Sequence, residues 1–376
     1  MRFFIPIIAA GFFHAAASSW AGETRVPAHF PAFSWDKVPT YKMFADAERL
    51  LSDAEAKRIA STSSFLCIEK NHAVKKLGGA DLGAKLEIER FRTLNPSAKC
   101  LFYFNSAYAY PFATHTRVFR FGKVEEPYRS FLILDPETGE PASRGRVNFF
   151  DVLNPEFRTW WVETAGKCVS ESGADGLFVD QMHGFSYLRR QRRAEVNAAQ
   201  AEMMRMTKNA IGPEKILLLN NGAHIPELFD IGDAFMFEHY ATKQLTKEAI
   251  VADWELMKKV SDAGKIAVWR IGVEVEAEGD ANLSAAESEK LSRERLPYHL
   301  AVFLIGARPY SYFQYGWGWT LQDGALVEYP EFSKPLGAPK GESSRPDPAG
   351  WVFTREFERA SVRVDLETSK ATIEWR

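Results

Sequence analysis

The chain has 376 residues, which is enough for one large domain or two ordinary ones. It carries 47 basic and 49 acidic residues, and this near balance gives no basis for binding nucleic acid or an anionic membrane surface. Aromatic residues make up 13% of the chain, a high content that fits a large core together with an aromatic-lined cleft.

The N-terminus has the three parts of a secretory signal peptide. Arg2 supplies a positive charge, residues 3–13 are mostly apolar, and small residues follow as far as Ala21. We expect cleavage after Ala21, with cleavage after Ala17 as the alternative. The apolar run is too short to span a bilayer. We therefore expect a secreted or periplasmic protein with no stable membrane insertion.

From residue 39 the chain alternates short apolar runs with helical patterns, which is typical of a parallel sheet or barrel. Ser52 and Glu55 form the capping-box pattern of a first helix. Asn154 and Pro155 begin a Trp-containing helix that we expect to end at Gly173. Most neighbouring strands are separated by such a helix. The predicted strands are residues 39–44, 65–68, 100–104, 177–179, 216–219, 234–237, 266–269 and 310–313.

Eight strands are better explained by a closed barrel than by an open sheet. The Gly-rich phosphate fingerprint of a dinucleotide fold does not follow the first strand. We therefore predict an α/β fold, a (β/α)8 TIM barrel with a small C-terminal β appendage. The predicted division is a signal peptide at 1–21, the catalytic barrel at 22–322, and a β extension packed on the barrel at 323–376. The connection from 106 to 153 is unusually long, and connections of that length usually have a function.

Two carboxylates stand at predicted strand ends: Asp180 ends the fourth strand and Glu238 ends the sixth. In a barrel these ends lie on the same rim, where active sites are built. Glycosidic hydrolysis generally uses such a pair, one carboxyl to protonate the leaving oxygen and one to attack the sugar carbon or activate water. Glu238 has the more apolar neighbours and suits the acid, while Asp180 suits the nucleophile or base. The sequence leaves these roles exchangeable, and it also allows Asp180 to be a simple loop cap.

Other predicted strand ends and the segments after them carry groups that suit sugar hydroxyls and ring faces. The predicted substrate-binding residues are Glu69, Asn105, Tyr108, Asn220, Asn221, His239, Tyr240, Trp269, Arg270, Tyr315 and Trp317. The expected partner is a carbohydrate substrate. The eight His residues are scattered, and the chain has no Gly-x-Ser-x-Gly elbow, so we expect neither a metal nor another cofactor.

The chain has three cysteines, Cys67, Cys100 and Cys168. An odd number leaves at least one of them unpaired. A disulfide between Cys67 and Cys100 is one alternative, because both lie in or beside neighbouring predicted strands. Buried free thiols are the favoured interpretation, since such cysteines often act as small core residues.

Four segments carry a resemblance to a known family: residues 33–36, 150–155, 175–180 and 237–238. They resemble the bacterial hypothetical glycosyl hydrolase family 15 and, more distantly, polygalactosaminidase-type and α-galactosidase-like barrels. The tail segments 335–339 and 354–357 are also similar to the ends of such proteins. The resemblance covers most of the mature chain and is strongest around Asp180. In related barrels the acidic residues that end strands four and six carry catalysis, so the resemblance implies these roles for Asp180 and Glu238. The family has no settled activity and supplies no substrate.

We therefore predict a glycoside hydrolase that cleaves O-glycosidic bonds of a poly- or oligosaccharide with this carboxylate pair. One alternative is a non-catalytic glycan-binding barrel of the cell envelope, which would bind sugars without releasing reducing ends. A second alternative is a barrel hydrolase that uses a metal and loses activity with a chelator.

Overall fold

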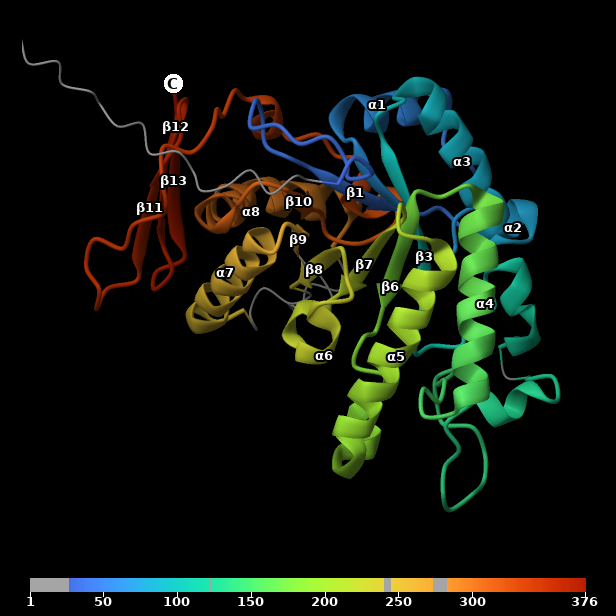
Figure 1. Cartoon of the computed structure of the whole chain (residues 1–376). Helices are drawn as coiled ribbons and strands as arrows, with labels where there is room; N and C mark the ends of the chain where they lie inside the picture. Colours follow the sequence, from blue (N-terminus) through green and yellow to red (C-terminus); the bar gives the residue numbers. More distant parts are fainter. Residues whose placement is uncertain (1–26, 122, 240–244, 273–282) are drawn as a thin grey trace, which may run out of the picture.

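A computed structural model describes residues 27–121, 123–239, 245–272 and 283–376. Eight parallel strands form a nearly closed barrel surrounded by helices (Figure 1). In order around the barrel they are β1 (Tyr41–Phe44), β2 (Phe65–Ile68), β3 (Lys99–Asn105), β6 (Gly176–Asp180), β7 (Ile216–Asn220), β8 (Ala234–Glu238), β9 (Ile266–Ile271) and β10 (Ser311–Tyr315). The last strand returns to the first, because the Phe313 amide donates to the Pro39 carbonyl at 2.8 Å.

The helices between the strands begin and end at the residues whose chemistry favours caps. Ser52 and Glu55 form the reciprocal capping box of α1, and Asn154 caps α4 through the amides of its first turn. Gly173 ends α4 with a φ of 71°, a left-handed conformation that glycine adopts without a steric penalty. The α-helices are α1 (Asp53–Thr62), α2 (Val74–Leu77), α3 (Ala80–Leu94), α4 (Pro155–Ser172), α5 (Arg193–Ile211), α6 (Pro226–Phe229), α7 (Lys247–Asp262) and α8 (Ala285–Gly306).

Alternate side chains of the barrel strands form two separate apolar layers. One buried cluster contains residues from all eight strands, among them Tyr41, Leu101, Phe178 and Val268. Residues from eight strands can meet only inside the barrel, so this cluster is the barrel interior. The residues between them, such as Leu177, face outward and pack with the helices in a larger cluster. The sheet therefore follows the period of two that strands impose on their side chains.

The predicted fold is confirmed, and the structure extends several strands at their carboxyl ends. Asn105, Asp180, Asn220, Glu238 and Arg270 belong to strands rather than to the loops after them. The short helices α2 and α6 were not predicted, because four residues are too few for a helical pattern to be recognised. The hairpin of β4 (Ser143–Arg144) and β5 (Val147–Asn148) in the long connection was also not predicted.

The C-terminal strands β11 (Val352–Glu356), β12 (Ala360–Asp365) and β13 (Lys370–Trp375) form an antiparallel sheet beside α8 (Figure 1). The buried Arg355 guanidinium donates to the carbonyls of Leu304 and Ile305 at 2.9 and 3.2 Å, and also to that of Ala307. These carbonyls lie at the C-terminal end of α8, where they lack partners within the helix. Arg355 thus joins the small sheet to α8, and the Phe353 ring also packs edge-on against Trp254 of α7 with ring centres 5.0 Å apart.

Two further expectations concern the cysteines and the membrane. Cys67, Cys100 and Cys168 are free and buried, as the favoured interpretation predicted. Among the helices that the structure describes, none is long and apolar enough to cross a membrane.

Candidate active site

The interior of the barrel changes from apolar to polar at the carboxyl ends of the strands. On seven strands, the residue two positions after the last apolar interior side chain is polar or charged. We call these residues the polar ring: Glu69, Asn105, Asp180, Asn220, Glu238, Arg270 and Gln314. Because side chains two apart share a face, the ring lies directly above the apolar interior. It contains the proposed catalytic pair.

Asp180 accepts four hydrogen bonds. Tyr103 Oη and Asn105 Nδ2 donate to its Oδ2 at 2.5 and 3.2 Å. The Gln181 amide and Asn220 Nδ2 donate to its Oδ1 at 2.7 and 2.9 Å. Gln181 has a φ of 64°, a left-handed conformation that is uncommon for a residue with a side chain. These four donors, on both oxygens, fix the orientation of the Asp180 carboxyl group.

Asn220 connects the two carboxylates. Its single Nδ2 atom donates to Asp180 Oδ1 at 2.9 Å and to Glu238 Oε2 at 2.5 Å. A side-chain amide has two N–H groups, so both bonds can form together. The two carboxylate oxygens are therefore separated by no more than the sum of these distances, about 5.4 Å. The end of β8 is held from β7 as well, because the Glu238 amide donates to Asn221 Oδ1 at 3.0 Å.

A cavity of about 580 Å³ opens above the ring. Its volume falls within the usual range for small-ligand sites. Both carboxylates line it, together with aromatic and cationic side chains. The lining residues are Met43, Glu69, Lys70, Tyr103, Tyr108, Tyr110, Arg144, Val147, Phe178, Asp180, Gln181, Asn220, Glu238 and Trp319.

One pair of opposite charges lines the cavity beside the two carboxylates. Lys70 forms an ion pair with Glu69, and its Nζ lies 5.2 Å from the centre of the Tyr103 ring. Burial lowers the pKa of Lys70, but the Glu69 carboxylate outweighs burial and the net pKa is raised, so Lys70 is charged. Burial and the Asp180 carboxylate raise the pKa of Tyr103 well above its usual value. Tyr103 therefore keeps its proton and acts as a donor to Asp180.

Five of the predicted site residues line the cavity: Asp180, Glu238, Glu69, Tyr108 and Asn220. Asn105 and Arg270 belong to the ring and contact residues of the cavity. Asn105 donates to Asp180, and the Arg270 guanidinium lies 4.3 Å from the ring centre of Trp319.

Five other predicted residues do not line the cavity. Trp269 and Tyr315 occupy the outward positions of β9 and β10, where Tyr315 Oη donates to the Ser292 carbonyl of α8 at 2.8 Å. His239 follows β8 and lies 3.2 Å from Asp253 of α7. Trp317 packs against Gly324 rather than lining the cavity. Asn221 supports the backbone of Glu238. Tyr240 lies outside the described residues.

The cavity also has lining residues that were not predicted from the sequence, among them Tyr103, Lys70 and Arg144. Tyr103 precedes Asn105 by two residues, so the period of two along β3 would have found it. Lys70 follows Glu69 directly. Arg144 comes from the hairpin in the long connection, and no pattern in the sequence indicates that this hairpin returns to the rim.

One group of possible metal ligands lies among the described residues, outside the polar ring. Asp81, His115 and Glu171 place one ligand atom each within 4.8 Å of one another. Asp81 already accepts hydrogen bonds from the amide and hydroxyl of Thr114 at 2.7 and 2.6 Å, and His115 lies 2.8 Å from Glu171. These residues do not line the cavity that holds Asp180 and Glu238.

Comparison with known proteins identifies the family. The profile of the hypothetical glycosyl hydrolase family 15 matches residues 92–361. The chain belongs to this family. It is therefore an enzyme of the glycoside hydrolase class. No curated protein matches the chain in a comparison of sequences.

Solved glycoside hydrolase structures are similar to this one. The α-galactosidase TtGalA from Thermus thermophilus is 15% identical, with a TM-score of 0.50 over 90% of this chain and 68% of that chain. The glycoside hydrolase domain of PelA from Pseudomonas aeruginosa is 12% identical, with a TM-score of 0.46 over 67% of this chain and 91% of that chain. The α-amylase from Geobacillus thermoleovorans is 12% identical, with a TM-score of 0.49 over 88% and 87%. At such identities the likeness to the α-galactosidase shows a common barrel fold and nothing finer.

Proposed function

We propose that this protein cleaves O-glycosidic bonds of a poly- or oligosaccharide by a retaining mechanism. In this mechanism Asp180 is the nucleophile and Glu238 is the general acid and base. The observation that carries the proposal is the bridge from Asn220 Nδ2 to both carboxylates, at the floor of a cavity that also presents aromatic rings.

The hydrogen bonds around Asp180 support its role as nucleophile. A nucleophilic carboxylate must be ionised and aimed at the anomeric carbon. Asp180 receives donors on both oxygens, from Tyr103, Asn105, Gln181 and Asn220. In the first step an Asp180 oxygen bonds to the anomeric carbon while Glu238 gives its proton to the leaving oxygen. In the second step Glu238 takes a proton from water, and the water oxygen replaces Asp180 on the carbon.

The spacing of the carboxylates favours retention. Retaining enzymes hold the two carboxyl groups about 5–5.5 Å apart, whereas inverting enzymes need about 6.5–9.5 Å to admit a water molecule. The shared nitrogen of Asn220 limits the facing oxygens of Asp180 and Glu238 to about 5.4 Å.

The walls of the cavity support a sugar substrate. Tyr108 and Tyr110 stack with ring centres 5.4 Å apart, and Trp319 lies on the cavity wall. Aromatic faces of this kind suit the C–H faces of sugar rings, while the polar ring supplies donors and acceptors for hydroxyl groups. With the predicted signal peptide, we place the substrate among extracellular or cell-envelope glycans.

The proposal is tested by screening the purified protein against soluble polysaccharides and p-nitrophenyl glycosides of both anomers, with new reducing ends or nitrophenol as the readout. Asp180→Asn should lower turnover on the order of 10⁴-fold or more. Glu238→Gln should lower it about 10²–10⁴-fold on glycans and less on nitrophenyl glycosides, whose leaving group needs little protonation. Unchanged turnover in either variant contradicts the assignment, and sugar binding without any release of reducing ends favours a binding barrel.

A further inference from the structure

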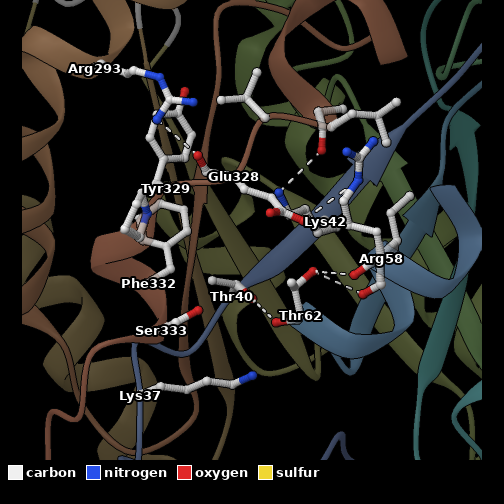
Figure 2. Close-up of a pocket in the computed structure, with 15 residues that line it drawn as sticks. Lys37, Thr40, Lys42, Arg58, Thr62, Arg293, Glu328, Tyr329, Phe332 and Ser333 are labelled. Atoms are coloured by element: carbon white, nitrogen blue, oxygen red, sulfur yellow. Dashed lines mark hydrogen bonds and ion pairs between the residues drawn. The ribbon is translucent and has the colours of Figure 1, made fainter. Parts of the chain in front are cut away.

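A second cavity, of about 400 Å³, lies outside the barrel (Figure 2). It is bounded by the outer face of β1, by α1, and by the segment that follows β10. In that segment the described chain forms only the short helical turns η6 (Leu321–Ala325) and η7 (Pro330–Ser333). These turns cover the barrel less closely than a long helix would, and they leave space against β1. No residue lines both this cavity and the one above the polar ring.

The wall of this outer cavity is strongly cationic. Lys37, Lys42, Arg58 and Arg293 line it, and Glu328 is the acidic residue among the lining side chains. Arg58 Nε lies 3.8 Å from the Glu328 carboxylate, which is itself 62% exposed. An ion pair of this length and exposure contributes little to stability. Arg293 is already bound by Glu289 of α8 at 2.7 Å. The other three cations, Lys37, Lys42 and Arg58, surround one carboxylate, so the cavity keeps an excess of positive charge.

Lys42 is the least expected of these cations. It occupies an outward position of β1, next to the buried Phe44 layer, where the other barrel strands place apolar residues. Its Nζ donates to the Ala325 carbonyl at 3.3 Å. Burial lowers the pKa of Lys42 to about 8, against the opposing effect of Glu328. An enclosed ammonium group is costly unless it is paired, and a bound anion would pair it.

The side of the cavity away from Lys42 and Arg58 carries two aromatic rings (Figure 2). The Tyr329 and Phe332 rings pack with centres 5.2 Å apart, and the apolar side chains of Ile59 and Leu326 also line the cavity. Arg293 covers the Tyr329 ring, with its guanidinium 5.3 Å from the ring centre. The cavity thus combines a site for negative charge with a site for an organic group, in a volume typical of small-ligand sites.

We propose that this outer cavity binds a small organic molecule that carries a phosphate or sulfate group. Lys42 and Arg58 hold the anion, since a guanidinium fork and an ammonium charge are the usual phosphate-binding groups in proteins. The organic part lies against Tyr329 and Phe332. The site is independent of the polar ring, so it is a second binding site and not part of the catalytic cavity.

The probes for this site are phenyl phosphate and phenyl sulfate, with inorganic phosphate and phenol as the two separated halves. Binding is measured by titration calorimetry at constant ionic strength and pH 7. We expect saturable binding of at least one phenyl ester, weaker binding of inorganic phosphate, and none of phenol at the same concentrations. The two esters show which anion is preferred.

Variants assign the binding to this cavity. Lys42→Met removes the ammonium group but keeps an unbranched side chain of similar length that suits an apolar layer, so this variant should fold. Arg58→Gln removes the second cation. Each should weaken binding about tenfold or more, because a charge-assisted hydrogen bond is lost. Lys57→Gln is the control: it removes an exposed cation from α1, the helix that carries Arg58, at a position that does not line the cavity. This variant should bind the esters as the wild type does.

Three results would overturn the proposal: no saturable binding of either ester, unchanged binding in Lys42→Met and Arg58→Gln, or an equal loss in Lys57→Gln, which would indicate general charge attraction. Lys42→Met should retain the wild-type turnover of glycosides. A negative binding result therefore does not bear on the proposed catalytic pair. The effect of Asp180→Asn on turnover likewise does not bear on the outer cavity.

Discussion

Two layers of the barrel interior differ by only two residues along each strand. On β7 the buried Leu218 is followed by Asn220, and on β8 the buried Met236 is followed by Glu238. The lower layer is apolar and buried, and only its uppermost side chains, Met43, Tyr103 and Phe178, reach the cavity that the polar ring faces. The same strand geometry therefore provides packing below and chemistry above. A rigid support of this kind fixes the carboxylates without the use of mobile loops.

The largest effect on stability is expected in the lower layer. Leu218→Ala removes a fully buried side chain and leaves a cavity inside the barrel. The free energy of unfolding should fall by about 2–5 kcal/mol, measured by urea denaturation. Turnover per folded molecule should stay near the wild-type value. A large loss of turnover with little loss of stability would break the distinction between the two layers.

Asn220 lies two residues after Leu218 on the same face of β7, and its replacement should affect catalysis rather than stability. Asn220→Leu removes the donor shared by Asp180 and Glu238. The value of kcat should fall about 10²-fold, as when one preorganised donor is removed from other active sites. Gln314→Met is the matched control, since Gln314 belongs to the ring but does not line the cavity. An equal loss of kcat in the control would show that any change in the ring disturbs the site.

The outward layer also contains an ionisable group, and its effect should be confined to stability. Burial of His299 in α8 lowers its pKa to about 3, so the folded protein keeps it neutral. The unfolded chain binds a proton below about pH 6.5, so this residue makes the folded state less stable as the pH falls from about 6.5 towards 3. Between pH 7 and pH 5 the loss due to His299 is about 2 kcal/mol.

His299→Leu should lack this loss. The measurement is the difference between wild type and variant in the free energy of unfolding at the two pH values, in which the contributions of other groups cancel. Equal pH dependence in the two proteins would show that His299 is not buried in its neutral form.

The smallest expected effect distinguishes the inward and outward faces of β10. Tyr315→Phe removes the hydrogen bond to the Ser292 carbonyl and should cost about 1 kcal/mol of stability. KM and kcat should not change, because Tyr315 lies behind the strand and does not line the cavity. A clear rise in KM would return Tyr315 to the substrate-binding residues that the sequence predicted.

Much of this architecture could be predicted from local sequence. The apolar runs located all eight strands, and the caps at Ser52, Asn154 and Gly173 located helix ends, because these signals depend on neighbouring residues alone. Asp180 and Glu238 were predicted because each follows an apolar run by one residue. They face the same cavity because the alternation within each strand also places them inward.

The predicted residues that do not line the cavity are explained mainly by one physical cause. Trp269 and Tyr315 stand near strand ends, as Asp180 does, but at outward positions. Position near a strand end does not determine which face a side chain lies on. Val268 and Tyr312 point into the barrel, and residues an odd number of positions after them, such as Trp269 and Tyr315, therefore point outward. The return of Arg144 to the rim depends on tertiary packing of a long connection, which no local pattern records.

Azide rescue tests the central claim, that Asp180 attacks the sugar while Glu238 protonates the leaving group, most directly. It uses the best glycoside from the screen. Asp180→Ala with azide should regain turnover and give a glycosyl azide of inverted configuration, because azide takes the vacated place of the nucleophile. Glu238→Ala should give a glycosyl azide of retained configuration, since Asp180 still forms the intermediate. Wild-type turnover in either variant without azide, or the reverse pattern of configurations, would contradict the account.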